Sequence, residues 1–155
     1  MRAVRYRYYN FSHFLKVLQS NLRDHNVLIK QAIIMVFNDI PVYLGVIGFI
    51  LMGIGSFCLP EKVTAQFDIP TLSTAGKNEV RAVYGGFGVL MGLMLITALF
   101  TPNLREGICL TVAAALGGMS IGRFLSAILD RHINGFPLFY MCLEAVLASL
   151  LFFAA

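Results

Sequence analysis

The chain has 155 residues, of which 58% are hydrophobic and only 13% are charged. A soluble domain typically carries about 25% charged residues, so this chain has too little charge to cover a folded surface in water. The formal net charge is +4, but the basic residues gather into no patch with interleaved aromatic side chains, so we expect no nucleic-acid partner. Composition therefore indicates an integral membrane protein.

Residues 1–39 precede the first long apolar run and form a basic N-terminal extension. Half of the 12 Lys and Arg residues lie in it, namely Arg2, Arg5, Arg7, Lys16, Arg23 and Lys30. An apolar stripe at helical spacing predicts an amphipathic helix lying on anionic lipid. The stripe consists of Phe11, Phe14, Leu15, Leu18 and Leu22. The alternative interpretation is that translation starts at Met35 and that the preceding stretch is not made.

Four long apolar runs follow, in a domain that we place at residues 40–155. Each is long enough, at about 1.5 Å per residue, to cross most of a ~30 Å hydrocarbon core. Continuous apolar runs favour helices over the alternating strands of a barrel. Their approximate limits are 42–59, 82–100, 107–129 and 138–155. The sequence thus predicts an all-α membrane protein with four spans.

The connections between the runs predict how the helices are arranged. Thr101 to Asn103 and residues 130–137 are short turns, so the helices that they join run antiparallel. Residues 60–81 are long enough to hold a short surface helix. Most Lys and Arg residues outside the spans lie on the side of the N-terminal extension and Arg105, which predicts that both termini are cytoplasmic. We therefore expect an antiparallel four-helix bundle.

Small residues recur along single faces of three expected helices. In a membrane such faces mark packing surfaces, because small side chains let two backbones approach closely. The faces are Gly45, Gly48, Met52 and Gly55 in the first span, Gly85, Gly88 and Gly92 in the second, and Ala114, Gly118, Gly122 and Ser126 in the third. The residues that we predict to mediate helix packing are Gly85, Gly88, Gly92, Gly118 and Gly122.

Two charges interrupt the last two spans, Arg123 and Glu144. A charge inside a span costs at least about 2.5–3.5 kcal/mol on insertion scales, so it normally faces the bundle interior and pairs. The two lie at similar depths below the same connection, which predicts an ion pair between Arg123 and Glu144.

Further polar residues fall near that pair, at the non-cytoplasmic end of the spans. The resulting cluster is Asn78, Glu79, Arg81, Tyr84, Arg123, Asp130, Tyr140 and Glu144. It is interpreted either as a pocket for a small molecule, a lipid headgroup or a proton, or as a structural network that determines helix register. We expect no comparable cluster at the opposite end.

Catalytic and metal-binding patterns are missing from the sequence. Cys58, Cys109 and Cys142 lack CxxC spacing, and the three histidines have no metal-ligand spacing. We therefore expect no catalytic residues, no metal and no cofactor, and the sequence favours a protein that is not an enzyme.

The string from Asn78 to Gly86, N-E-V-R-A-V-Y-G-G, is followed by Gly122, Arg123 and Glu144. With these residues the chain resembles, over roughly 42–155, the bacterial membrane family catalogued as domain of unknown function 4345. The resemblance implies a four-helix protein of the bacterial inner membrane without an established activity, and residues 1–39 depart from its pattern. The outline also looks like DoxX-type membrane proteins, some of which are linked to quinone or thiol redox chemistry.

Three functions remain open from the sequence. The leading interpretation is a membrane module that binds a small hydrophobic ligand or a membrane lipid through the polar cluster, or that supports assembly with a partner. The alternatives are a redox accessory that uses a quinone and a small transporter or channel, which would have to be a homo-oligomer because four helices are few for a solute pathway.

Overall fold

The structure is a computed structural model that describes Lys16, residues 27–30 and residues 37–155. The chain divides into two units, Met1–Phe37 and Asn38–Ala155. The expected amphipathic stripe, the Met35 start and most of the N-terminal extension lie outside the described residues. The first helix of the second unit begins at Phe37.

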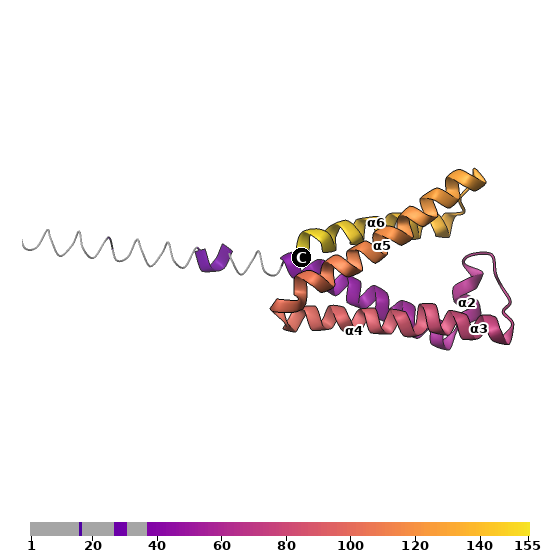
Figure 1. The fold of residues 1–155 in the computed structure, drawn as a ribbon, viewed down its shortest axis with the longest axis horizontal. Coiled ribbons are helices and arrows are strands. Elements are labelled where there is room, and N and C mark those ends of the chain that lie inside the picture. The colour runs from indigo at the N-terminus through magenta and orange to yellow at the C-terminus, as the bar shows by residue number, and fades with distance from the viewer. Residues whose placement is uncertain (1–15, 17–26, 31–36) are drawn as a thin grey trace, which may run out of the picture. The chain divides into compact units, whose positions relative to one another are not determined.

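Residues 37–155 are helical, with short connections and no strand. A helix covers Phe37–Cys58. It is followed by α2 (Pro60–Ala65), α3 (Thr74–Val80), the π-helix η1 (Arg81–Gly86), α4 (Phe87–Phe100), α5 (Pro102–Asp130) and α6 (Gly135–Ala154) (Figure 1). Because α3, η1 and α4 are continuous, the described chain has four helices long and apolar enough to cross a membrane. The predicted all-α fold with four spans is confirmed.

The helices extend beyond the predicted apolar runs, because polar residues at their ends also adopt helical structure. The second helix begins at Thr74, eight residues before the predicted run, where the Ser73 hydroxyl accepts a hydrogen bond from the Gly76 amide at 3.1 Å. The third begins at Pro102, a residue suited to the first helical turn. It ends before Arg131, whose φ of 52° is left-handed.

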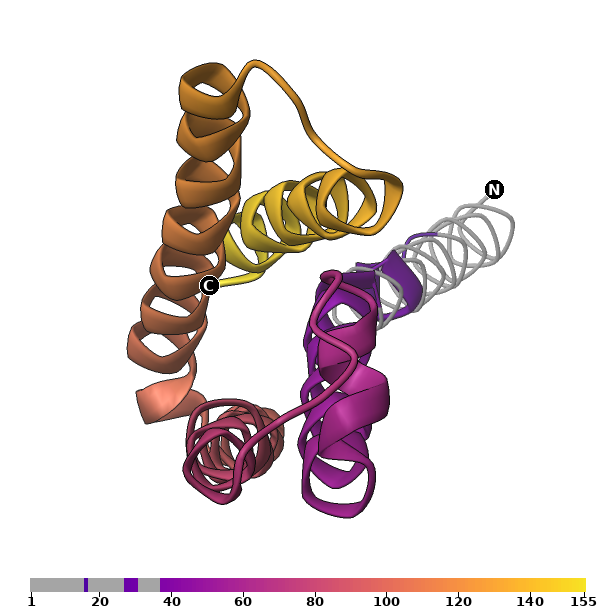
Figure 2. The ribbon, with the colours of Figure 1, turned by 90° about the vertical axis from the view of Figure 1, so that its right-hand side faces the viewer.

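Successive long helices alternate in direction (Figure 1). The start of the first helix, the turn at Thr101 and the end of α6 therefore lie together, at what we call the termini end. Residues 59–73 and 131–134 lie at the opposite, loop end. Figure 2, which faces the loop end, shows the four helices following one another round the bundle in chain order.

The main apolar core joins all four helices. Its fully buried side chains include Val42, Leu95, Cys109, Val112 and Leu151. These residues lie nearer the termini end, and towards the loop end the α5–α6 pair separates from the first helix and α4 (Figure 1).

Glycines bring the first helix and α4 into close contact. A Cβ added to Gly53 would lie 2.8 Å from the backbone nitrogen of Val89, and one added to Gly88 would lie 3.1 Å from the Phe49 carbonyl oxygen. A Cβ at Gly92 would lie 2.7 Å from the Ile50 side chain. A Cβ at Gly53 would collide with backbone, and one at Gly88 or Gly92 would force its neighbours to shift. The two backbones therefore pack closely, as small-residue interfaces in membranes do.

The expected packing role of the small residues in α5 is not seen among the described residues. Nothing lies within 4 Å of a Cβ built at Gly118 or Gly122. The contact face of α5 is instead formed by its larger neighbours, including Val112, Ala113 and Leu116, which are buried. In the first helix Gly53, which the expected stripe omits, makes the closest approach, whereas Gly48 faces open space.

Candidate functional site

The predicted ion pair between Arg123 and Glu144 is present in the spans. The Arg123 Nε lies 3.0 Å from Glu144 Oε2, and Arg123 Nη2 donates to Glu144 Oε1 at 3.1 Å. Arg123 comes from α5 and Glu144 from α6, and the short turn at residues 131–134 brings the two helices side by side. Glu144 is only 7% exposed, so without Arg123 its charge would be buried and uncompensated.

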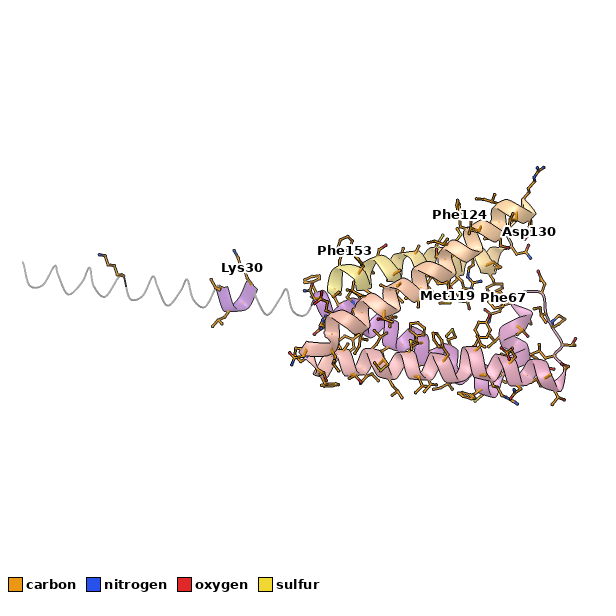
Figure 3. All side chains as sticks on the ribbon, in the orientation of Figure 1. Lys30, Phe67, Met119, Phe124, Asp130 and Phe153 are labelled. Carbon is orange, nitrogen blue, oxygen red and sulfur yellow. The ribbon has the colours of Figure 1, made fainter. Side chains whose placement is uncertain are left out.

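Two adjacent aromatic rings lie against the guanidinium of Arg123. Its Cζ atom lies 5.5 Å from the ring centroid of Phe67 and 5.6 Å from that of Tyr140, both within the range of cation–π contacts. The two ring centroids are 5.7 Å apart. Phe67 follows α2 and lies between that helix and the α5–α6 pair (Figure 3). Aromatic ring surface thus covers part of the Arg123 guanidinium, whose side chain stays 23% exposed.

Three consecutive residues after α2, Gln66, Phe67 and Asp68, join the loop to the α5–α6 hairpin; we call them the strap. The Tyr140 hydroxyl donates to Gln66 Oε1 at 2.7 Å, and Asn134 Nδ2 donates to Asp68 Oδ2. Asp68 has a φ of 62°, a left-handed conformation that Asp tolerates better than most residues and that ends α2 sharply.

The strap was not predicted as part of the site. It lies in the connection of residues 60–81, where no periodic pattern or motif points to Phe67. The available signal is weak: a lone aromatic residue in a polar loop, between a glutamine and an aspartate.

The remaining members of the predicted cluster are placed elsewhere. Arg81 is exposed and donates from Nε to the Phe57 carbonyl at the end of the first helix, at 3.3 Å. Asn78 and Glu79 are exposed on α3. Asp130 accepts a hydrogen bond from Ser126 one turn earlier in α5, at 3.0 Å.

Tyr84 is half-buried within η1 and has no side-chain hydrogen bond to the described residues. Of the eight predicted cluster residues, the structure therefore brings together Arg123, Tyr140 and Glu144.

The motif that contains Arg81 and Gly85 has a local structural role. Gly85 lies against the Phe57 ring, with 3.2 Å between a built Cβ and the ring carbons. Arg81 places its charge at the C-terminal carbonyls of the first helix, where the helix dipole favours a cation. The residues Arg81–Gly86 form η1. Segments of π-helix are frequent at functional positions.

A second polar cluster, which the sequence interpretation excluded, lies at the termini end. Arg105 pairs with Asp39 and donates from Nη2 to the Asn38 carbonyl at 2.8 Å. Its Nε donates to the Ala154 carbonyl at 3.1 Å. One guanidinium therefore joins the start of the first helix, the start of α5 and the end of α6, and Arg's planar fork suits this geometry.

The Arg123–Glu144 pair leaves some N–H groups of Arg123 without a partner among the described residues. Arg123 donates from Nε and Nη2 to Glu144, and its Nη1 has no hydrogen-bond partner among the described residues. Both N–H groups of Nη1 and the second N–H of Nη2, three in all, are therefore available to an acceptor next to two aromatic rings.

Groups for metal or thiol chemistry are missing from the described part of the chain. No set of three or more His, Cys, Asp or Glu side chains there could hold a metal ion. Cys58, Cys109 and Cys142 are free thiols.

Comparison with known proteins adds the family. Neither the curated proteins nor the solved structures contain a match to this chain. One family does match, over residues 30–155, and its description is "Domain of unknown function (DUF4345)". The match covers all four long helices and both polar clusters. The chain therefore belongs to the family of domain of unknown function DUF4345, and it is a multi-pass membrane protein.

Proposed function

We propose that this protein is a non-enzymatic membrane module that binds a small lipid-soluble ligand at the Arg123–Glu144 pair. The observation that supports the proposal is the set of N–H groups of Arg123 without a partner among the described residues, on a guanidinium whose Cζ lies 5.5 Å and 5.6 Å from the ring centroids of Phe67 and Tyr140. A ligand with an apolar body and a hydrogen-bond acceptor would match this surface, because it could accept from Nη1 while contacting the aromatic rings.

The cost of the pair favours a ligand role over a purely structural one. An ion pair in an apolar setting is often no more stable than two well-packed hydrophobic residues. Helix register could also be determined by apolar side chains alone. A pair that leaves donor capacity free contributes something that apolar packing cannot, namely a directional hydrogen bond within the membrane.

Native mass spectrometry of the detergent-purified protein tests the proposal, because it reports retained small molecules and subunit number together. The variant is Arg123→Leu with Glu144→Leu, which removes both charges and leaves neither one unpaired. The matched control replaces the exposed pair Glu61 and Lys77, which are 3.1 Å apart, with glutamines. We expect retained ligand in the wild type and the control and its loss from the Leu variant. A wild type that retains nothing, or a Leu variant that retains as much as the control, would overturn the proposal.

We further propose that both termini face the cytoplasm and that the membrane is the bacterial inner membrane. The excess of Lys and Arg on the N-terminal side supports this orientation. Asn38 and Ala154 also lie at the same end, since Arg105 donates to both of their carbonyl groups. A C-terminal alkaline phosphatase fusion, which is active only outside the cytoplasm, should be inactive, and an active fusion would reverse the proposed orientation.

A further inference from the structure

We infer that Glu144 determines the charge of the ligand, so that the site accepts a neutral carbonyl compound and rejects an anion. This inference rests on the proposed function, because it concerns selectivity at the same site. The chemical class is an apolar molecule whose acceptor is an uncharged carbonyl oxygen, as in a ketone or an ester.

The charge of the Arg123–Glu144 pair disfavours an anionic ligand. Arg123 alone would attract phosphates and carboxylates, as guanidinium groups generally do. Here both carboxylate oxygens of Glu144 already accept from Arg123, at 3.0 Å and 3.1 Å, so the pair has no net charge. Phe67 and Tyr140, which lie against the guanidinium, are uncharged. An approaching anion therefore meets a cation that the Glu144 carboxylate already compensates.

The edges of the Arg123 guanidinium differ in what they can bind. The bidentate contact uses the Nε and Nη2 edge of the guanidinium, which is the edge that a second carboxylate or phosphate would need for the same fork. An anion could gain that edge only by displacing Glu144, which is 7% exposed and would then be buried without a partner. The other edge, Nη1 with the second N–H of Nη2, has no partner among the described residues and can donate to a carbonyl oxygen. An anion could use the same edge, but it would add a second negative charge to a guanidinium whose charge Glu144 already compensates.

Three probes with the same alkyl chain separate the possible ligands: a methyl ketone, a methyl ester and an alkyl phosphate. Each is titrated into the detergent-solubilised full chain, and bound probe is counted by native mass spectrometry. We expect the ketone, the ester or both to bind at least about tenfold more tightly than the phosphate, a difference of about 1.4 kcal/mol. Tighter binding of the ester indicates a membrane lipid as the natural source, and tighter binding of the ketone indicates a free carbonyl compound.

Two outcomes of this titration are distinct failures. Phosphate binding equal to or tighter than both neutral probes would overturn the charge inference and leave the proposed binding function intact. Absence of binding by all three probes would overturn the inference and, if the wild type also carries no ligand from the cell, the proposed function as well.

Substitution of Glu144 provides the second test. Glu144→Gln keeps the shape of the side chain and leaves Arg123 as a net cation, so phosphate binding should rise and the preference for neutral probes should fall by at least about tenfold. The control is Glu106→Gln, the same change at an exposed carboxylate of α5, which should keep the wild-type preference. A folded Glu144→Gln protein with unchanged preference contradicts the inference. If that variant does not fold, the wild-type comparison of the three probes still decides.

Discussion

At the scale of single residues, Arg123 and Glu144 show how charge is accommodated in an apolar helix pair. Each comes from one helix of a hairpin, and the short turn at residues 131–134 places them at matching depth. Their contact satisfies both carboxylate oxygens and leaves Arg123 Nη1 free among the described residues. The arrangement removes the cost of two isolated charges while keeping one polar group available.

Removal of one member of the pair should destabilise the protein more than removal of both. We expect Arg123→Leu to lower the free energy of unfolding by about 3–5 kcal/mol, because Glu144 would remain buried and unpaired. The double variant with Glu144→Leu should recover most of that loss. Unfolding in mixed micelles by increasing SDS measures both. A double variant whose loss equals the sum of the two single losses would show that the residues do not interact.

Glu61 provides a pH-dependent contact outside the spans. Its pKa is lowered from the ordinary value of 4.5, first by the hydrogen bond from Lys77 and then by the Leu72 amide. A carboxyl whose pKa is lower in the folded state stabilises that state above its unfolded pKa and stops doing so as the pH falls through the lowered value. The contact between α2 and α3 should therefore hold at neutral pH and be lost only at a pH below 4.5, the ordinary pKa of the carboxyl.

The amide resonance of Leu72 in NMR spectra reports this change, because that amide points at Glu61 Oε1, at 3.5 Å. Its shift should titrate with a midpoint below 4.5, and Glu61→Gln should abolish the transition. Glu79→Gln, which removes an exposed carboxylate of α3, is the control and should leave it in place. A Leu72 transition that persists in Glu61→Gln would assign it to another group.

At the scale of elements, the first helix and α4 are held by backbone proximity. At Gly53, Gly88 and Gly92 an added Cβ would lie 2.7–2.9 Å from atoms of the facing helix. In a membrane, apolar side chains gain little by moving from lipid into a helix interface, because both surroundings are apolar. Close van der Waals contact therefore contributes much of the helix association. The glycines of α5 lack such contacts among the described residues, so the same residue type has different consequences in neighbouring helices.

Two glycines of the first helix should respond oppositely to alanine. Gly53→Ala would place a methyl group 2.7 Å from the Val89 side chain and 2.8 Å from its backbone nitrogen, so we expect a loss of about 1–3 kcal/mol. Gly48→Ala meets nothing within 4 Å and should stabilise by about 0.5–1 kcal/mol through helix propensity. Thermal unfolding in detergent compares the two variants. Equal effects would contradict the close approach at Gly53.

At the scale of the whole molecule, the polar contacts lie mainly at the two ends of the helices. Arg105 joins three helix ends at the termini end, and the strap joins the loop to the α5–α6 hairpin at the other. The acidic side chain of Asp39 near a helix start and the cation beside the end of α6 also match the helix dipoles. The apolar core between the ends provides close packing, and the end contacts determine which helices meet.

Loss of the Arg105 fork should loosen the termini end specifically. Arg105→Lys keeps the charge but cannot bond Asp39, Asn38 and Ala154 together, so we expect a loss of about 1–3 kcal/mol. Amide hydrogen exchange should accelerate in the last turn of α6 and remain unchanged at the loop end. Arg131→Lys, at an exposed position of the loop end, is the control. Uniform acceleration along all four helices would contradict a local role.

The sequence by itself determined the membrane setting, the four spans and the pair of Arg123 with Glu144. These follow from strong local costs, because lipid excludes charge and unpaired backbone groups, and a short turn places adjacent helices side by side. It did not determine which face of each helix is packed, since lipid and protein interior are both apolar and the hydrophobic pattern does not separate them. Gly53, the position of Phe67 over Arg123 and the Arg105 fork were therefore decided by the tertiary structure, where residues distant in sequence meet.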